Sequence, residues 1–246
     1  MRIDIFCLFP EMFASPLAHS IIKRASDRGL VNIHTHNIRD YTHDRHRTVD
    51  DYPYGGGPGM VMKPEPVFEA VETIRRRLGL EAIPTALLTP QGRLFTEAIA
   101  REFAALPHIM LICGHYEGFD DRIREHLATD EISIGDYVLS GGEVAAMVVV
   151  DAVVRLMPGA LGSASSANND SHGDCLLEHP QYTRPAVYRT WEVPQVLLSG
   201  NHGEVAKWQR SEAILRTARR RPDLLEKAQL CDKERKWISE AMSNPK

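Results

Sequence analysis

Three short apolar runs in this chain each break off into a glycine-rich loop, and this recurrence constrains the fold more than any other feature. The runs are predicted strands, and the residues are 85–89 before the loop 90–92, 109–113 before 114–118, and 132–134 before 135–142. Glycine has no Cβ, so the backbone of such loops can approach a ligand closely. Buried strands that end this way predict one composite binding pocket at the carboxyl edge of a parallel sheet.

The rest of the chain supplies the other elements of such a fold. Strand-like runs alternate with helix-like segments at the spacing of a parallel sheet wrapped by helices. Further strands are expected at 2–9 and 31–37, and the strand that contains the third glycine-ended run is expected at 131–134. Residues 10–13 lead toward a first helix that is expected to end at about Arg28. Further helices are expected at 65–80, 96–106, 119–127 and 143–157 in this α/β core, and at 204–220, 222–229 and 232–242 beyond it. Residues 38–62 are expected to form an irregular polar loop.

A segment of small and polar residues separates the core from the C-terminal helices. Pro158 and Gly159 end the last core helix, and residues 160–174 cannot bury enough apolar surface to order themselves. The sequence therefore predicts a core domain at 1–159, a flexible linker at 160–175 and a small helical domain at 176–246.

Composition favours an enzyme of the cytoplasm. Hydrophobic residues make up 43% and charged residues 25% of the chain. We find no apolar run of the roughly 20 residues that a membrane span needs, and no signal peptide. The four cysteines are scattered, as expected for reduced thiols.

Charge is unevenly distributed along the chain. Residues 176–246 carry 13 Lys and Arg against 9 Asp and Glu, a balance of +4, whereas residues 1–175 carry 16 against 24, a balance of −8. A basic terminal domain fits contact with a polyanion. A merely solvated basic helix face is the alternative.

Arg155 is unusual because it lies in an almost wholly apolar helix. Its nearest charged neighbour in that helix is Asp151, four residues earlier, so the two share a face and can pair. A structural ion pair is one interpretation. The other is that Arg155 projects into the pocket, where it would hold an anionic substrate or a developing negative charge.

Two neighbouring polar segments also invite a functional interpretation. The loop 52–60 places four glycines between aromatic residues and a methionine, which suits a loop that closes on a flat base, although a surface turn is the alternative. It lacks the ending of a phosphate-binding P-loop. His43 and His46 alternate with arginines that would repel a metal cation, so phosphate contact by Arg45 or Arg47 is better supported than zinc.

Taken together, the motifs become specific. They run in order from residue 8 to about 222: 8–13 (LFPEMF), 41–51 (YTHDRHRTVDD), 54–60 (YGGGPGM), 113–118 (CGHYEG), 133–143 (SIGDYVLSGGE), 180–185 (PQYTRP) and 193–202 (VPQVLLSGNH). With these motifs the chain closely resembles the bacterial tRNA (guanine-N1)-methyltransferase family, which modifies the guanine 3′ of the anticodon and belongs to the trefoil-knotted SPOUT class.

The resemblance implies a deep trefoil knot in the parallel-sheet core, with S-adenosylmethionine bound by the three glycine-ended loops. The positions it assigns to the cofactor are Leu88, Pro90, Gly114, Tyr116, Glu117, Ile134, Gly135, Asp136, Tyr137, Val138, Leu139, Gly141 and Gly142. Those it assigns to the tRNA substrate are Tyr54, Gly57, Gly59, Arg184 and Ser199.

The resemblance also implies catalytic roles and partners. Asp170 matches the general base, Arg155 the arginine that engages the guanine, and Glu117 is the candidate ligand of a Mg²⁺ ion. From its sequence context alone, Asp170 would be a solvated linker carboxylate. The expected partners are a tRNA anticodon arm and a second copy of the chain, in a homodimer with shared active sites and without any membrane.

Two departures and two rival functions accompany this resemblance. His172 stands where the family usually has an aromatic residue, and Glu178 where it usually has an aspartate. One rival is an RNA-binding protein that has kept the knot and lost the reaction, against which the presence of Asp170 and Arg155 argues. The other is a SPOUT enzyme that methylates a ribose 2′-hydroxyl, which has no need of a linker aspartate.

Overall fold

The structure is a computed structural model that describes residues 1–161 and 170–243. The chain divides into two compact units, Met1–Gly162 and Ser163–Lys246. The expected linker falls partly on residues 162–169, which lie outside the described residues.

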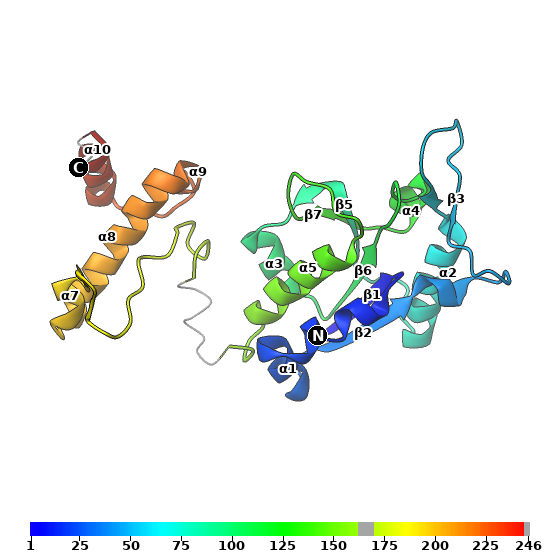
Figure 1. Ribbon diagram of the computed structural model, residues 1–246, viewed down its shortest axis with the longest axis horizontal. Helices are drawn as coiled ribbons and strands as arrows, with labels where there is room; N and C mark the ends of the chain where they lie inside the picture. The colour runs from blue at the N-terminus through cyan, green and yellow to red at the C-terminus, as the bar shows by residue number, and fades with distance from the viewer. Residues whose placement is uncertain (162–169, 244–246) are drawn as a thin grey trace. The chain divides into compact units, whose positions relative to one another are not determined.

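The N-terminal unit is built on a five-stranded sheet in the order β2-β1-β6-β5-β7. Every neighbouring pair of strands in this sheet is parallel, which confirms the predicted α/β class (Figure 1). The strands are β1 (Arg2–Cys7), β2 (Asn32–Asn37), β5 (Thr85–Leu94), β6 (His108–Cys113) and β7 (Asp130–Ser133).

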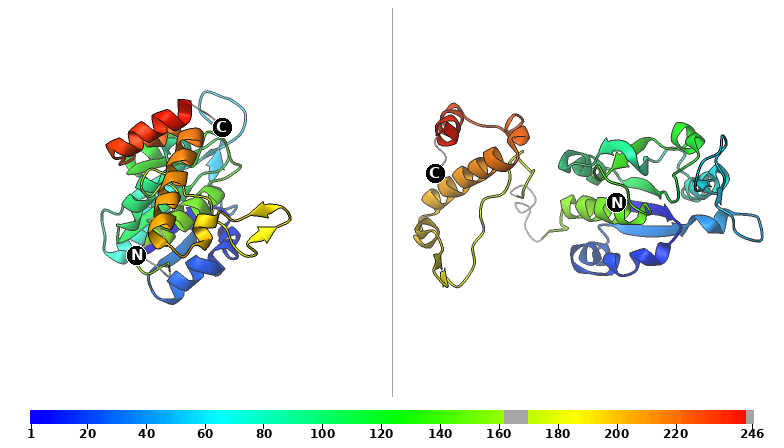
Figure 2. Two further views of the ribbon diagram at one scale, coloured as in Figure 1. Left: turned by 90° about the vertical axis from the view of Figure 1, so that its left-hand side faces the viewer. Right: turned by 45° about the horizontal axis from the view of Figure 1, so that its top comes forward.

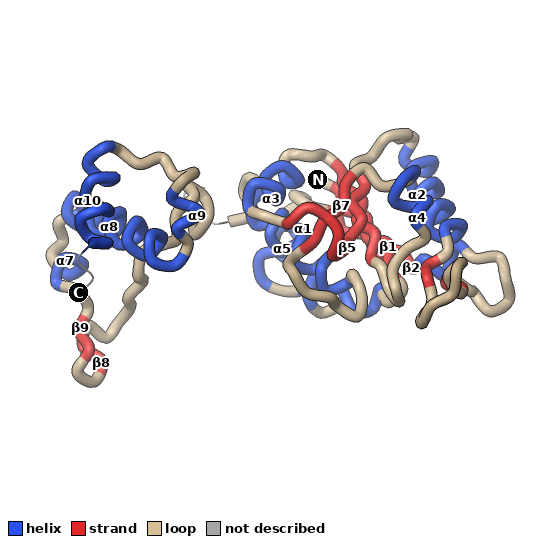
Figure 3. The backbone as a smooth tube through the Cα atoms, turned by 90° about the horizontal axis from the view of Figure 1, so that it is seen from above, coloured by secondary structure: helices blue, strands red, loops and turns tan. Residues whose placement is uncertain are grey.

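Helices cover both faces of this sheet, as Figure 3 shows. Side chains of β1 alternate between two cores: Ile3 and Ile5 pack with α1, α3 and α5, and Phe6 packs with α2 and α4. The two faces are thus buried separately, as a parallel sheet requires. The helices are α1 (Ser20–Asp27), α2 (Pro64–Leu78), α3 (Glu97–Ala104), α4 (Asp121–His126) and α5 (Glu143–Leu156).

The helix expected to follow residues 10–13 and to end at about Arg28 is α1, which begins only at Ser20. Two 3₁₀ turns, η1 (Pro10–Phe13) and η2 (Pro16–Ala18), precede α1. Proline has no backbone N–H to continue a helix, and Ser20 has a positive φ of 52°, so the segment cannot run as one helix. The polar stretch 38–62 is irregular as expected, apart from η3 (Ile38–Tyr41) and the short antiparallel pair β3 (Asp50–Asp51) and β4 (Val61–Met62).

Strand β5 also runs further than predicted. Its pairing with β7 jumps from Leu88 to Arg93, both of which oppose Ile132, so the intervening residues bulge out of the ladder. Gly92 lies in this bulge, and a Cβ there would be 2.4 Å from the backbone nitrogen of Ile132. Glycine therefore permits the strand to resume after the bulge.

The C-terminal unit is mainly helical, with α7 (Gln195–Leu198), α8 (His202–Arg220), α9 (Pro222–Leu225) and α10 (Asp232–Ser243). Leu176, Ile214 and Ala228 form its small core. An exposed two-stranded hairpin, β8 (Val187–Tyr188) with β9 (Trp191–Glu192), extends from the helices (Figure 2). Within the described part of the chain, none of the helices combines the length and apolar character needed to cross a bilayer.

Candidate active site

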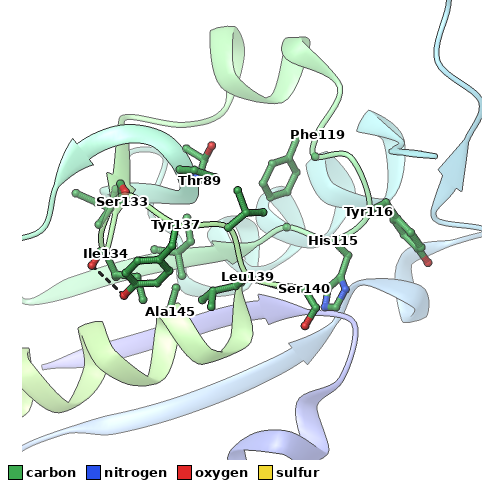
Figure 4. A pocket seen from close by; sticks show the side chains of 18 of the residues that line it. Thr89, His115, Tyr116, Phe119, Ser133, Ile134, Tyr137, Leu139, Ser140 and Ala145 are labelled. Carbon is green, nitrogen blue, oxygen red and sulfur yellow. Dashed lines mark hydrogen bonds between the residues drawn. The ribbon is translucent and has the colours of Figure 1, made fainter. Parts of the chain in front are cut away.

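The three glycine-ended loops converge on one pocket at the carboxyl edge of the sheet. Figure 4 shows His115 and Ser140 at one end of it and Ile134 and Tyr137 at the other. The cavity measures about 140 Å³ and opens to solvent. Its lining comes from residues 88–90, 114–119, 132–135, 137–142 and 145.

Two of these loops touch through their backbones. The Gly142 N–H donates to the carbonyl of Gly114 at 2.8 Å, and His115 forms an antiparallel bridge with Gly141. A Cβ on Gly142 would lie 2.7 Å from the Cα of Cys113, which a real side chain essentially never does. The wall of the pocket therefore exists only because residue 142 is glycine.

The loop after β7 exposes apolar side chains at the pocket. The Tyr137 hydroxyl donates to the carbonyl of Ile134 at 3.2 Å, which folds the ring back over its own loop. Val138 is 82% exposed although it is purely apolar. Together with Leu88, Leu139 and Ala145, these side chains offer apolar walls on which a flat base can rest.

The glycine-rich loop 54–60 packs against Glu117, which lines the pocket. The Glu117 N–H donates to the carbonyl of Met60 at 3.0 Å, and a Cβ on Gly59 would lie 2.5 Å from the Glu117 side chain. Gly57 and Gly59 have positive φ, and the Tyr54 side chain is fully exposed. The loop is thus held at the Glu117 wall, with Tyr54 presented to solvent.

A buried carboxylate that the sequence analysis left without a role lies beneath the pocket. Glu143 is 1% exposed, and its carboxylate is 2.7 Å from Nε2 of His115. The signal that could have revealed it is a carboxylate in the first turn of an otherwise apolar helix, where the helix dipole favours negative charge.

Two buried thiols lie beside Glu143. Burial, reinforced by the Glu143 charge, raises the pKa of Cys7 to about 12 and raises the pKa of Cys113 well above its usual range. Both thiols therefore stay protonated and unreactive at neutral pH.

The predicted cofactor-binding residues gather at this pocket. All of them line it except Asp136, which is exposed on the loop after β7. Among the described residues, no group of three or more His, Cys, Asp or Glu side chains could by itself hold a metal ion, so Glu117 offers a single protein carboxylate.

Arg155 does not line this pocket. It lies twelve residues beyond Glu143, which places it roughly 18 Å further along α5. There it lines a second cavity with Asp151, Glu97 and apolar side chains that include Met147 and Leu17. One interpretation of the sequence was that Arg155 projects into the glycine-walled pocket. Within this chain, Arg155 lies elsewhere.

The remaining predicted residues belong to the C-terminal unit. The carbonyl of Asp170 accepts the Gly173 N–H at 3.2 Å, and the Leu177 N–H donates to Oγ1 of Thr217 at 2.8 Å, which ties this segment to α8. The Ser199 hydroxyl donates to the carbonyl of Val196, and Arg184 is exposed. In the same segment, the Glu178 N–H donates to the Ser171 hydroxyl.

A parallel sheet with a glycine-walled pocket at its carboxyl edge defines an α/β protein that binds a nucleotide-like ligand. The chain belongs to the tRNA (guanine-N1)-methyltransferase family: the family described as "tRNA (Guanine-1)-methyltransferase TrmD" matches residues 1–227. The class is trefoil-knotted, so the predicted SPOUT fold is confirmed by this membership. The chain is therefore an enzyme that methylates N1 of guanine 37 in tRNA, with S-adenosylmethionine as the methyl donor.

Similar proteins cover essentially the whole chain. A tRNA (guanine-N(1)-)-methyltransferase of Dehalococcoides mccartyi is 58% identical over 248 residues, which span all of both chains. One of Staphylococcus epidermidis is 56% identical and covers 97% of this chain and 96% of its own. One of Geobacillus kaustophilus is 54% identical and covers 98% of each.

Proposed function

We propose that S-adenosylmethionine binds in the glycine-walled pocket, where the loops after β5, β6 and β7 meet. The observation that carries this proposal is the backbone contact of Gly142 with residues 113 and 114, because only glycine lets the loops after β6 and β7 meet closely enough to wall one pocket. Apolar walls from Leu88 and Leu139 suit an adenine ring. Asp136, exposed on the same loop, is the remaining cofactor residue of this proposal.

We further propose that Asp170 and Arg155 act on the guanine. Guanine N1 carries a proton at neutral pH and is a poor nucleophile until the proton leaves. The Asp170 carboxylate accepts that proton, and the Arg155 guanidinium stabilises the negative charge that builds on O6. Bound S-adenosylmethionine supplies the electrophilic methyl group on its sulfonium sulfur.

The position of Arg155 supports a site shared between two copies of the chain. Val144 and Val148 are exposed by 45% and 43%, and they begin a stripe along α5 that ends at Arg155. Two copies that pack these stripes about a two-fold axis perpendicular to α5 run antiparallel. Arg155 of each then lies near the Gly142 end of its partner's helix, so the homodimer completes both sites.

Mixed dimers test this arrangement. One subunit carries Gly142→Val, which forces apart the loops that wall the pocket, and the other carries Arg155→Ala, which removes the cation. Each variant alone is nearly inactive, but in a shared-site dimer one intact pocket meets one intact Arg155. Random mixing should restore about one quarter of wild-type activity. A mixture as inactive as its parents would contradict the shared site.

The tRNA contacts follow from charge and exposure. We propose that residues 176–246, with their balance of +4, bind the anticodon arm, with Arg184 and Ser199 as contacts and the exposed Arg219 and Arg220 near the end of α8 adding charge. Tyr54, Gly57 and Gly59 belong to the loop that we place over the target base. Doubling the salt concentration should therefore weaken tRNA binding far more than S-adenosylmethionine binding.

A Mg²⁺ ion is the last partner of this proposal. Glu117 would hold it, with water and substrate oxygens supplying the other ligands, since Mg²⁺ is commonly bound through one or two carboxylates. Chelation should lower activity, added Mg²⁺ should restore it, and Glu117→Gln should abolish the response.

We place the enzyme in the cytoplasm, in keeping with its four free cysteines.

A further inference from the structure

A single carboxylate at the foot of the pocket joins three elements that are distant in the sequence. Oε1 of Glu143 accepts the N–H of Leu8, immediately after β1, at 3.2 Å. Oε2 is 2.7 Å from Nε2 of His115, in the loop after β6. Glu143 itself begins α5, so the ends of β1 and β6 and the start of α5 share this one group.

The loop after β7 rests on this pair. A Cβ on Gly141 would lie 2.3 Å from Nε2 of His115 and 2.7 Å from Oε2 of Glu143. The backbone at Gly141 therefore packs directly against the hydrogen bond between the two side chains. The bond from Gly142 to the carbonyl of Gly114 holds the same two loops together a residue further on.

Aromatic rings fix the other side of His115. Its ring meets that of Phe9 edge-on with centroids 5.2 Å apart, and that of Tyr116 with centroids 6.1 Å apart. Tyr116 has a positive φ of 60°, and the N–H of Gly118 closes this turn onto the carbonyl of His115. The orientation of His115 therefore affects the loop after β6 and the loop after β7, which form two walls of the pocket.

We infer that Glu143 and His115 are positioning residues for the methyl donor: the buried pair sets the spacing between the loops after β6 and β7 that wall its site. Glu143 is buried, with both carboxylate oxygens engaged by the protein, so it acts through the loops and not on the ligand. This inference rests on the proposed placement of S-adenosylmethionine in this pocket.

Calorimetric titration of the full chain with S-adenosylmethionine, alongside steady-state methylation of tRNA, tests the pair. Glu143→Ala should raise the Kd of S-adenosylmethionine by about 10- to 100-fold, because a charge-assisted buried network is lost. The KM for tRNA should change by less than about threefold. Glu143→Gln should recover much of the affinity, since its amide oxygen can still accept the Leu8 N–H.

A double-mutant cycle shows whether the two residues act as a unit. His115→Gln should weaken binding about as much as Glu143→Ala, and combining these two changes should cost little more than the worse single change. Losses that multiply would overturn the inference. If Glu143→Ala fails to fold, His115→Gln decides the question by itself, because unchanged affinity for S-adenosylmethionine in that variant would overturn the inference.

Asp4 provides the matched control. It is a fully buried carboxylate that also pairs with histidines, His36 and His108, but it lies within β1. Asp4→Asn should lower stability and leave the Kd of S-adenosylmethionine within about twofold. An equal loss of affinity in Asp4→Asn, or unchanged affinity in both Glu143 variants, would overturn the inference. If S-adenosylmethionine does not bind in this pocket at all, Gly142→Ala would bind it normally. That result would contradict the proposed function, and it is distinguishable from the outcomes that overturn this inference.

Discussion

Asp170 and Arg155 divide the proposed work on the guanine between a proton acceptor and a cation. The role of Asp170 could not be derived from the surrounding sequence, since a carboxylate among small polar residues is usually only solvated. The role of Arg155 was one of two interpretations of a charged residue in an apolar helix. The structure ties the segment after Asp170 to α8 through Leu177 and Thr217. That attachment places Asp170 in the unit that we propose to bind tRNA, so in the proposed mechanism proton removal is coupled to binding of the correct substrate.

The first prediction concerns the base. Asp170→Ala should lower kcat by at least about 10²-fold, because general-base catalysis typically contributes 10²- to 10⁴-fold. The Kd of S-adenosylmethionine should stay within about twofold, since Asp170 lies outside the pocket lining. Single-turnover methylation and calorimetry measure the two effects. Normal turnover in this variant would remove the assignment.

The second prediction concerns the cation. Arg155→Ala should lower kcat by on the order of 10²-fold if the guanidinium stabilises charge that develops on O6. Arg76→Ala is the control, because Arg76 is an exposed arginine of α2 remote from the proposed chemistry. A structural role would instead show as lost stability with kcat retained.

At the scale of elements, the sequence predicted best where burial is continuous. Strand β6 is buried along its whole length, and the position of α5 follows from its apolar composition. The continuation of β5 past Pro90 was missed, because a bulge depends on the partner strand and not on the local pattern. The hairpin β8–β9 was missed as well, since two residues per strand leave no periodicity to detect.

The third prediction tests the close approach of the two loops. Gly142→Ala should weaken S-adenosylmethionine binding by at least about tenfold, since the new Cβ would meet backbone atoms of Cys113 and Gly114 that cannot move away without shifting the wall. Gly203→Ala in α8 is the matched control, because the nearest atom to its Cβ is 3.5 Å away. Calorimetry on both variants gives the comparison.

Residues of the candidate site could be predicted when their signal is local in the sequence, and could not be predicted when their role depends on a distant partner. The glycines that wall the pocket were evident because each lies in a loop that follows directly after an apolar strand in the sequence. The contact of His115 with Glu143 joins residues 28 apart, and that of Glu143 with Leu8 joins residues 135 apart. Neither contact leaves a local signature, so only the fold reveals them.

At the scale of the whole molecule, a buried charge cluster holds the sheet of the N-terminal unit together. Asp4 accepts hydrogen bonds from Arg2 and lies 2.6 Å from His36 and 2.7 Å from His108, so it links three neighbouring strands. Burial by itself would raise the pKa of Asp4. The hydrogen bonds from Arg2, His36 and His108 outweigh burial and hold that pKa well below its usual range.

The fourth prediction follows from this lowered pKa. A carboxyl whose pKa is depressed in the folded state contributes its full stability above about pH 4, and the contribution is lost as pH falls below that value. At pH 7, Asp4→Asn should lower the free energy of unfolding by about 3–5 kcal/mol. The difference from wild type should narrow under acid conditions. Urea unfolding at several pH values measures this difference in the free energy of unfolding between wild type and Asp4→Asn. A difference that grows as the pH falls would contradict the lowered pKa of Asp4.

The methylated product is the most direct test of the central claim that this pocket delivers a methyl group to a purine edge. A tRNA transcript with guanines at positions 36 and 37 is incubated with the enzyme and S-adenosylmethionine, digested, and analysed by mass spectrometry beside a transcript substituted at position 37. We predict 1-methylguanosine at position 37 and no product from the substituted transcript. A methyl group on a ribose, or cofactor binding without any methylated guanine, would contradict the account.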